Sequence, residues 1–240
     1  MSSIENTVVI TGASRRLGLF LTESFLKQGD NVVCVTRTPS TELQKLQCER
    51  LTILPITRYD ADGAAALADE LAAKFSRIDL LVHNASIFDS DADVKKDFAQ
   101  HYKALFDIHM AVPAQLNLAL QSLLSVSGSG NIIHITDIYA ENPKSDFALY
   151  CSTKAGLENL MKGFAKKFAP AIRVNSIQPG PIQFLPEHND AHKEAVLGQT
   201  LLAEEGGFFP IYQAVQSVLQ NRFMTGVSIK VDGGRSLSGW

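Results

Sequence analysis

Two side chains four residues apart, Tyr150 and Lys154, are the pair in this sequence best suited to proton transfer. They lie in a segment with helical periodicity, in which positions four apart share one face and can point into one pocket. A free phenol has a pKa of about 10 and is a slow acid or base at neutral pH. A neighbouring ammonium stabilises the phenolate, so we expect Lys154 to lower the pKa of Tyr150 toward the working range. Taken alone, the same spacing also fits an ordinary solvated helix face.

A glycine-rich turn near the N-terminus could bind phosphate. Residues 11–18 (TGASRRLG) follow an apolar run and precede a helical pattern. Gly12 would let the chain turn sharply off a strand, and Gly18 would let the helix pack closely on the sheet. The N–H groups of the loop and of the helix N-terminus would then face an anion. The pattern predicts a dinucleotide site, and a tight turn without a ligand is the alternative interpretation.

The end of the second predicted strand indicates which dinucleotide would bind. A nicotinamide cofactor without a 2′-phosphate usually meets an acidic side chain at this place, bonded to the ribose hydroxyls. Here the sequence has Arg37 between Thr36 and Thr38, and a cation flanked by two hydroxyls suits a phosphate instead. Arg15 of the glycine-rich turn could reach the same group. We therefore expect NADPH, and the alternative is that Arg37 is an ordinary surface arginine.

The hydrophobic pattern predicts the scaffold that would position these residues. Seven short, nearly continuous apolar runs alternate with amphipathic segments, as expected of strands covered on both faces by helices. Such alternation implies right-handed βαβ crossovers and a mostly parallel sheet. We predict an α/β fold: a single-domain, doubly wound parallel sheet of Rossmann type that spans residues 1–240. The predicted strands are 7–11, 31–37, 51–56, 78–83, 131–136, 172–177 and 227–231, and the predicted helices are 17–28, 64–75, 94–124 (one extended or two short), 147–168 and 211–219.

The least regular stretch lies between the sixth predicted strand and the last predicted helix. It contains several prolines and a pair of glycines within residues 179–210. An excursion beside the carboxyl ends of parallel strands is where a substrate loop would lie. We expect such a loop around residues 181–210, with a plain surface loop as the alternative. The aromatic segment 208–210 (FFP) would line the substrate mouth or an oligomer contact.

Composition argues against several other classes of function. The 240-residue chain is 45% hydrophobic, with 22 Lys+Arg against 25 Asp+Glu and a formal net charge of −3. This dispersed charge argues against nucleic acid or an anionic membrane as the main partner. No apolar run approaches the roughly 18 residues of a spanning helix, and the first six residues lack signal-peptide features, so we expect a cytoplasmic protein. We expect no metal site, because the cysteines are scattered (Cys34, Cys48, Cys151) and three histidines stand alone as polar core or cleft residues (His83, His109, His134).

Five motifs in order along the chain resemble those of the short-chain dehydrogenase/reductase family. They are 11–18 (TGASRRLG), 83–86 (HNAS), Tyr150-xxx-Lys154, 173–180 (RVNSIQPG) and 231–234 (VDGG). The resemblance covers essentially the whole chain and implies a nicotinamide-dependent oxidoreductase that forms a homotetramer. It also implies that Asn84 and Ala85 line the adenosine part of the cofactor site, and that the Pro179-Gly180 turn lies near the nicotinamide. Tyr150 would then be the proton donor and Lys154 its activator.

Three departures from the family pattern resemble its pteridine reductase branch, in particular the bacterial dihydromonapterin reductases. Arg16 replaces the usual middle glycine of the first loop, Asp137 stands where most members carry serine, and Phe88 replaces a small residue. Segments 187–191 (EHNDA) and 231–237 (VDGGRSL) also resemble that group. The branch implies NADPH-dependent reduction of a dihydropterin, dihydromonapterin or dihydrofolate, to its tetrahydro form.

The chemistry of these residues suits a C=N substrate better than a ketone. An ionised Asp137 would repel the charge that grows on a carbonyl oxygen, whereas a carboxyl can deliver a proton to a ring nitrogen, directly or through water. Phe88 could stack on a flat heterocycle. Arg16 could neutralise the pyrophosphate and reach polar atoms of the ring. The alternatives are core packing for Phe88 and a satisfied buried carboxylate for Asp137.

The predicted site combines three sets of residues. The catalytic set is Asp137, Tyr150 and Lys154. The cofactor-binding set is Gly12, Ser14, Arg15, Arg16, Leu17, Gly18, Arg37, Thr38, Asn84, Ala85, Tyr150, Lys154, Pro179, Gly180 and Ile182. The substrate-binding set is Arg16, Ser86, Phe88, Asp137 and Tyr150.

Two further departures keep other functions open. Ala111 replaces an asparagine that family members use to relay protons to the lysine, and Thr57 stands nearest to an aspartate that commonly contacts adenine. One alternative function is a reductase of ketones or 3-oxoacyl thioesters, which Asp137 disfavours. Another is a catalytically silent NADPH-binding sensor, for which Ala111 is the one hint.

Overall fold

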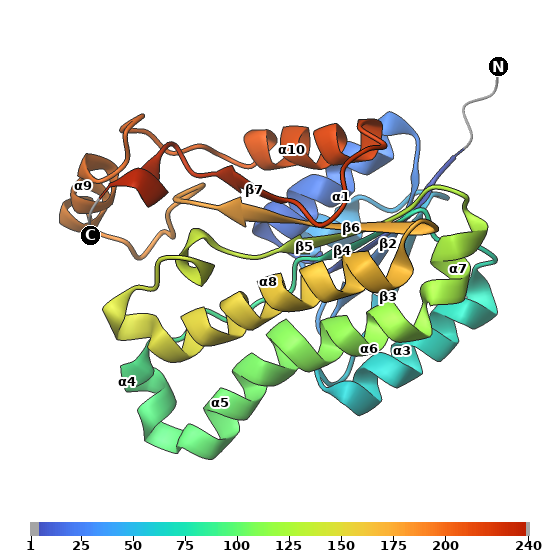
Figure 1. The fold of residues 1–240 in the computed structure, drawn as a ribbon, viewed down its shortest axis with the longest axis horizontal. Coiled ribbons are helices and arrows are strands. Elements are labelled where there is room, and N and C mark those ends of the chain that lie inside the picture. The colour runs from blue at the N-terminus through green and yellow to red at the C-terminus, as the bar shows by residue number, and fades with distance from the viewer. Residues whose placement is uncertain (1–4, 239–240) are drawn as a thin grey trace.

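A computed structural model describes residues 5–238 and places seven parallel strands in one sheet (Figure 1). Their order is β3-β2-β1-β4-β5-β6-β7. This order confirms the predicted doubly wound fold. Each of the seven predicted strands is present, and the sixth runs two residues further than predicted, to Pro179. The strands are β1 (Thr7–Thr11), β2 (Asn31–Thr36), β3 (Leu51–Pro55), β4 (Leu80–His83), β5 (Gly130–Ile135), β6 (Ile172–Pro179) and β7 (Ser228–Val231).

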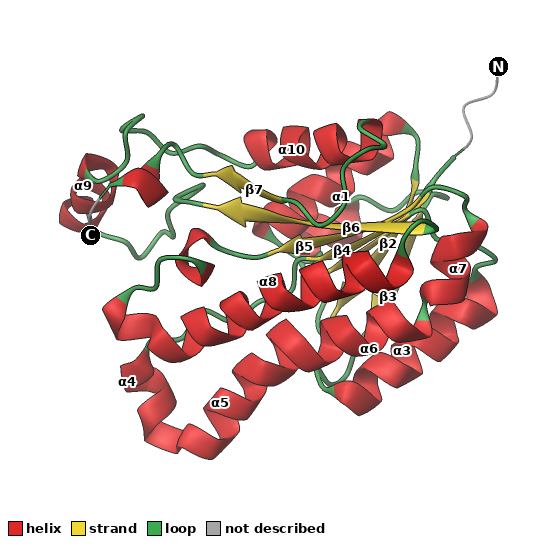
Figure 2. Ribbon diagram, in the orientation of Figure 1, coloured by secondary structure: helices red, strands yellow, loops and turns green. Residues whose placement is uncertain are grey.

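Helices cover both faces of the sheet (Figures 1 and 2). One layer contains α1 (Arg16–Gln28) and α10 (Phe209–Gln220), and the other contains α3 (Ala61–Lys74), α6 (Val112–Ala119) and α8 (Ala148–Phe168). Successive residues of β1 point to opposite layers, since side chains alternate along a strand. Val9 packs with the α3, α6 and α8 side, whereas Val8 and Ile10 pack with the α1 and α10 side. This arrangement explains why the strands are apolar throughout.

The predicted long helix 94–124 is divided by a wide turn. After α4 (Asp91–Val94), α5 (Phe98–Phe106) passes into a π-helical turn over Asp107–Ala111, then into α6, and α7 (Gln121–Val126) follows. The backbone dihedral angles stay in the helical region across both junctions. Pro113 lies directly after this turn and has no N–H to donate to the carbonyl four residues earlier. The prediction of one extended or two short helices is therefore only partly correct.

Besides α4, the short helices α2 (Thr41–Lys45) and α9 (Asp190–Gly198) were not predicted. Each begins with a side-chain cap: the Ser40 hydroxyl accepts from the Leu43 N–H at 3.1 Å, and the Asn189 amide oxygen accepts from the His192 N–H at 2.8 Å. Only Leu43 of α2 is buried, and no residue of α9 is. Without an apolar stripe, hydrophobic periodicity cannot reveal such helices.

The carboxyl ends of the strands form one edge of the sheet, and the strand order reverses between β1 and β4. In doubly wound sheets, ligands bind in the crevice beyond this reversal. The glycine-rich turn follows β1, Asn84 to Phe88 follow β4, and Asp137 follows β5. Among residues 5–238, no helix combines the length and apolar character needed to cross a membrane.

Candidate active site

The glycine-rich turn packs against the loop that follows β4. Gly12 has a φ of 66°, in the left-handed region, and a Cβ built on it would lie 2.7 Å from Ala85 Cα. A Cβ on Gly18 would lie 2.2 Å from the Gly12 carbonyl oxygen. Both positions therefore require glycine, as the sequence indicates. The turn brings backbone N–H groups to the N-terminus of α1, where an anion can bind.

Asn84 and Thr11 hold the turn in place. The Asn84 side-chain amide donates to the carbonyl oxygens of Thr11 and Gly12, each at 3.1 Å. The Thr11 hydroxyl accepts from the backbone N–H groups of Asn84 and Ala85, also at 3.1 Å each. Asn84 thus braces the phosphate turn itself, a contact that the expected adenosine-lining role does not include.

Ser14 links the same turn to the segment after β2. Its hydroxyl donates to the Thr38 carbonyl oxygen and accepts from the Ser40 N–H, both at 2.8 Å. The single hydroxyl hydrogen is used in this contact, so the side chain cannot donate it to a phosphate. The side chain of Leu17 is buried in the core, which leaves only its backbone to face a ligand. Arg15 is exposed.

Arg37 lies just beyond the end of β2, and its side chain is exposed. Its guanidinium carbon is 5.8 Å from the centre of the Tyr59 ring, within the range of a cation–π contact. Tyr59 follows β3 and was not predicted, because no motif marks it. An aromatic contact of this kind keeps the cation beside the carboxyl end of β2.

Asp137, Tyr150 and Lys154 meet at the carboxyl end of β5. The Tyr150 hydroxyl donates to Asp137 Oδ2 at 2.8 Å, and Asp137 Oδ1 accepts from the Tyr139 N–H at 2.9 Å. The Lys154 ammonium donates to the Ile135 carbonyl oxygen at 3.1 Å and lies 5.7 Å from the centre of the Tyr150 ring. The structure therefore brings the three predicted catalytic residues together.

Burial shifts the proton equilibria of all three groups. It raises the pKa of Asp137, and the Tyr139 N–H and the Lys154 charge offset only part of that effect. It also raises the pKa of Tyr150 well above its ordinary value, and the adjoining Asp137 carboxylate raises it further. The same burial lowers the pKa of Lys154 to about 8. The expected lowering of the Tyr150 pKa is wrong, because burial disfavours the phenolate and the Asp137 carboxylate opposes a second negative charge beside it.

Two phenylalanines form an aromatic wall beside Tyr150. The Phe88 ring stacks on Phe147, with ring centres 4.4 Å apart and 15° between the planes, and it meets Tyr150 edge-on at 4.8 Å. Phe88 is 53% exposed, so the core-packing interpretation of this residue is wrong. Phe147 was not predicted, although its position three residues before Tyr150 at the start of α8 could have indicated it. Such a surface suits a flat ring.

His109 forms another part of the wall. It is fully buried, and its ring meets Tyr150 edge-on with centres 5.5 Å apart. The sequence indicated a core or cleft histidine, and the structure places it in the wall of the site. The other two predicted structural histidines, His83 and His134, are buried behind the site and bridged by the Asn117 side chain. Within residues 5–238, no group of three or more His, Cys, Asp or Glu side chains is arranged to hold a metal ion.

The segment after β6 is joined to the glycine-rich turn by Arg16. The Arg16 guanidinium donates to the Gln183 carbonyl oxygen at 2.6 Å, and its carbon lies 5.8 Å from the centre of the Phe208 ring. Arg16 itself has a φ of 51°, where glycine is usual. One side chain thus connects the phosphate turn to the predicted substrate loop.

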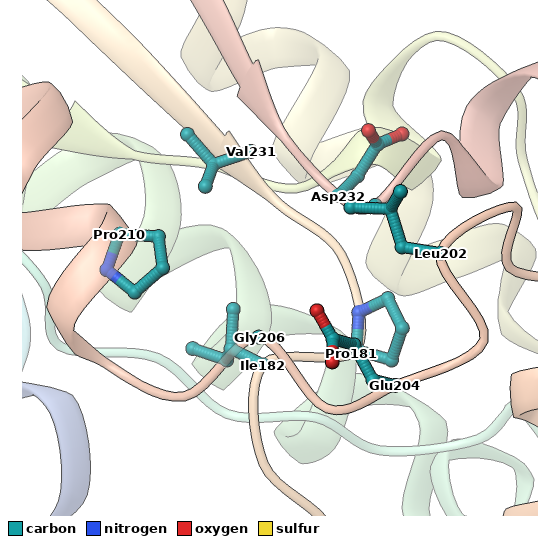
Figure 3. Close-up of a pocket in the computed structure, with 9 residues that line it drawn as sticks. Pro181, Ile182, Leu202, Glu204, Gly206, Pro210, Val231 and Asp232 are labelled. Carbon is teal, nitrogen blue, oxygen red and sulfur yellow. The ribbon is translucent and has the colours of Figure 1, made fainter.

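A cavity of about 170 Å³ lies under this segment (Figure 3). Figure 3 shows Ile182, Pro210 and Val231 around one end of it, and Leu202 and Asp232 at the other. The lining is largely apolar and begins directly after the Pro179-Gly180 turn. Gly180 is held close to β7, since its N–H donates to the Val231 carbonyl oxygen at 3.0 Å.

Comparison with known proteins agrees with this geometry. A family model described as short chain dehydrogenase matches residues 6–194, well over half of the chain. The chain belongs to the short-chain dehydrogenase/reductase family. It is therefore an oxidoreductase, and nicotinamide dinucleotides are the cofactors of this family.

Two relatives and two solved structures illustrate the match. The chain is 32% identical to a dihydromonapterin reductase of Klebsiella pneumoniae subsp. pneumoniae and 33% identical to one of Escherichia coli K12, with 96% of each chain covered in both cases. A gluconate 5-dehydrogenase from Burkholderia cenocepacia, solved with NADP and tartrate, has a TM-score of 0.88 at 22% identity, covering 98% of this chain and 97% of that one. An apo SCOR enzyme from Clostridium thermocellum has a TM-score of 0.86 at 23% identity, covering 99% and 95%. The solved structures support the fold alone.

Proposed function

We propose that this oxidoreductase reduces a dihydropterin, dihydromonapterin or dihydrofolate, to its tetrahydro form with NADPH as reductant. The observation that carries the proposal is the hydrogen bond between the Tyr150 hydroxyl and the Asp137 carboxyl. A carboxyl at this position opposes charge on a carbonyl oxygen and suits protonation of a ring nitrogen. The aromatic wall of Phe88 and Phe147 offers a flat surface beside it. Similarity to dihydromonapterin reductases supports the same substrate class.

The residues around the glycine-rich turn fit the phosphates of such a cofactor. Gly12 lets the turn pack directly against the Ala85 backbone, and the N–H groups at the start of α1 would then face the pyrophosphate. Arg37 would bind the 2′-phosphate, and the Lys154 ammonium would bind the nicotinamide ribose. When bound, the reduced nicotinamide supplies a hydride.

Asp137 and Tyr150 would hold and deliver the proton. Adding hydride to the carbon of a C=N bond leaves the adjacent nitrogen in need of a proton. Because burial raises the pKa of Asp137, the carboxyl keeps its proton to higher pH than a free aspartate does. The phenol, whose pKa is raised well above its ordinary value, stays protonated and orients the carboxyl through its hydrogen bond. Asp137 is then the acid, and Tyr150 holds it in place.

The experiment is a spectrophotometric assay of NADPH oxidation with dihydromonapterin, dihydrofolate, simple ketones and a 3-oxoacyl thioester. We expect turnover with the dihydropterins and little with the ketones or the thioester. Ketone or thioester turnover without dihydropterin turnover would identify a carbonyl reductase instead. Tight NADPH binding without any turnover would identify a silent sensor.

We also propose that the chain forms a homotetramer, as the family resemblance implies. Phe98 and Phe106, both on α5, are 56% and 49% exposed and are available for contact with a second copy. Light scattering would then give the mass of four 26.2-kDa chains.

A further inference from the structure

A chain of hydrogen bonds runs from the backbone of α8 through His109 to the exposed hydroxyl of Ser86. His109 Nε2 lies 2.8 Å from the Ser86 hydroxyl oxygen, and His109 Nδ1 lies 2.8 Å from the Thr153 hydroxyl oxygen. The Thr153 hydroxyl in turn lies 2.8 Å from the Tyr150 carbonyl oxygen, one turn back along α8. His109 is fully buried and Thr153 is 4% exposed, whereas Ser86 is exposed. The chain therefore couples two buried groups to one that can meet a ligand.

The chemistry of these groups determines the direction of every bond. A carbonyl oxygen only accepts, so the one hydroxyl hydrogen of Thr153 is donated to Tyr150. The Thr153 oxygen must then accept from His109, which requires the proton of the imidazole to be on Nδ1. Burial and the Lys154 charge lower the pKa of His109 well below its ordinary value, so the ring is neutral and has one N–H. Nε2 is therefore an acceptor. The Ser86 hydroxyl lies 3.4 Å from the Ile87 carbonyl oxygen but only 2.8 Å from Nε2, so the shorter contact takes its one hydrogen.

We propose that His109 and Thr153 fix the Ser86 hydroxyl as a hydrogen-bond acceptor toward the substrate, so that the site selects an N–H donor at this position. A pterin carries such a donor in its exocyclic amino group. A free serine hydroxyl can rotate to donate or to accept a hydrogen bond, so it would not distinguish a ligand N–H donor from a ligand acceptor. His109 is a positioning residue in this account, because it acts through Ser86. The substrate part of the inference rests on the proposed function, whereas the direction of the hydrogen bonds does not.

The tautomer of His109 can be measured without substrate. Nitrogen-15 NMR of histidine-labelled protein distinguishes a protonated ring nitrogen from an unprotonated one, and His109→Gln assigns the signal. We expect Nδ1 of His109 to be protonated at neutral pH. A proton on Nε2, or on both nitrogens, would overturn the proposal whatever the enzyme reduces.

The second measurement compares two ligands, pterin and lumazine, which has a carbonyl in place of the amino group. We expect wild-type protein with NADPH to bind pterin about tenfold more tightly than lumazine, as the loss of one hydrogen bond predicts. Thr153→Val removes the acceptor that fixes the tautomer and should bring this ratio close to one. Thr153→Ser keeps the hydroxyl and should preserve both the ratio and the Nδ1 signal.

These readouts separate this proposal from the proposed function. Dissociation constants do not require turnover, so a protein that fails to reduce dihydropterins can still show the selective binding. If Thr153 has only a structural role, Thr153→Val would weaken the binding of pterin and lumazine equally and leave the ratio of their dissociation constants unchanged. The inference would be overturned if Thr153→Val left the ratio of pterin to lumazine affinity unchanged. It would also be overturned if Thr153→Ser lost this selectivity as fully as Thr153→Val does. The dissociation constant of NADPH, measured by fluorescence, shows that each variant is folded.

Discussion

The proton chemistry of the site depends on two oxygen atoms 2.8 Å apart, Asp137 Oδ2 and the Tyr150 hydroxyl. Burial disfavours the charged form of each, so the pair favours a shared proton over two separate charges. Lys154 supplies a positive charge behind them, and its own pKa is lowered to about 8 by the same burial. An arrangement of this kind supports proton delivery to a base better than stabilisation of an alkoxide.

Arg37 is predicted to select the cofactor. We expect Arg37→Ala to weaken NADPH binding about 10- to 150-fold, the usual range for a lost hydrogen bond to a charged group. NADH binding should change less than about twofold, because NADH lacks the 2′-phosphate. Fluorescence titration of both cofactors measures the difference. Arg50→Ala is the matched control, since it removes an exposed positive charge before β3, at the opposite end of the sheet; equal losses for NADPH and NADH in Arg37→Ala would contradict the assignment.

Arg16 is predicted to carry backbone strain. Arg16 has a φ of 51°, in the left-handed region. This conformation destabilises a residue with a side chain by about 1–2 kcal/mol relative to glycine. Arg16→Gly and Arg16→Ala both lose the contact with Gln183, so their difference reports the strain. We expect the glycine variant to have the higher free energy of unfolding in urea, by about 1 kcal/mol. Glu23, in the middle of α1, provides the control. There the alanine variant should have the higher free energy of unfolding than the glycine variant, because alanine is the better helix former.

Residue spacing within single helices and strand ends was sufficient to predict part of the site. The turn 11–18 and the Tyr150–Lys154 pair follow from sequence alone, because one helix or one strand end determines each. The contact between His109 and Tyr150 could not be predicted, since it depends on the π-helical turn over Asp107–Ala111, which changes the phase of the helix. The Tyr150 pKa depends on burial and on Asp137, which no spacing within α8 encodes.

Gly18 of α1 provides a test of the close contact that the cofactor turn requires. Its substitution by alanine would put a Cβ 2.2 Å from the Gly12 carbonyl oxygen. We expect Gly18→Ala to lower the free energy of unfolding by about 1–3 kcal/mol, the usual cost of overpacking, and to weaken NADPH binding. Gly163→Ala in α8 has no heavy atom near the new Cβ. This control should instead raise the free energy of unfolding by about 0.5–1 kcal/mol in the same urea titration, and equal effects of the two variants would contradict the packing argument.

Three histidines, His83, His109 and His134, are buried inside the molecule. His83 and His134 lie in neighbouring strands with ring centres 4.8 Å apart, and Asn117 bridges them. Burial lowers the pKa of His83 to about 4, and it lowers the pKa values of His109 and His134 well below the ordinary value. All three are therefore neutral in the folded protein but become charged in the unfolded chain as the pH falls.

The stability of the whole molecule should depend on pH for this reason. Between pH 6.5 and about 4, His83 binds a proton in the unfolded chain but not in the folded one, so its contribution to the free energy of unfolding falls as the pH falls. Each buried histidine contributes about 1.4 kcal/mol per pH unit to that slope. We expect His83→Gln to lower the slope of the free energy of unfolding against pH by about 1.4 kcal/mol per pH unit, measured by urea titrations across this range. A slope unaffected by His83→Gln would contradict a neutral buried His83.

The most direct test of the account is the single-turnover rate of dihydropterin reduction for wild-type enzyme and Asp137→Ser, measured against pH with NADPH bound. The account predicts a wild-type rate that falls as the pH rises through the raised pKa of Asp137. It predicts that Asp137→Ser reduces the rate at least about 100-fold, the lower limit for a general acid, while the dissociation constant of NADPH stays the same. A variant that reduces dihydropterins at the wild-type rate would show that this carboxyl does not deliver the proton.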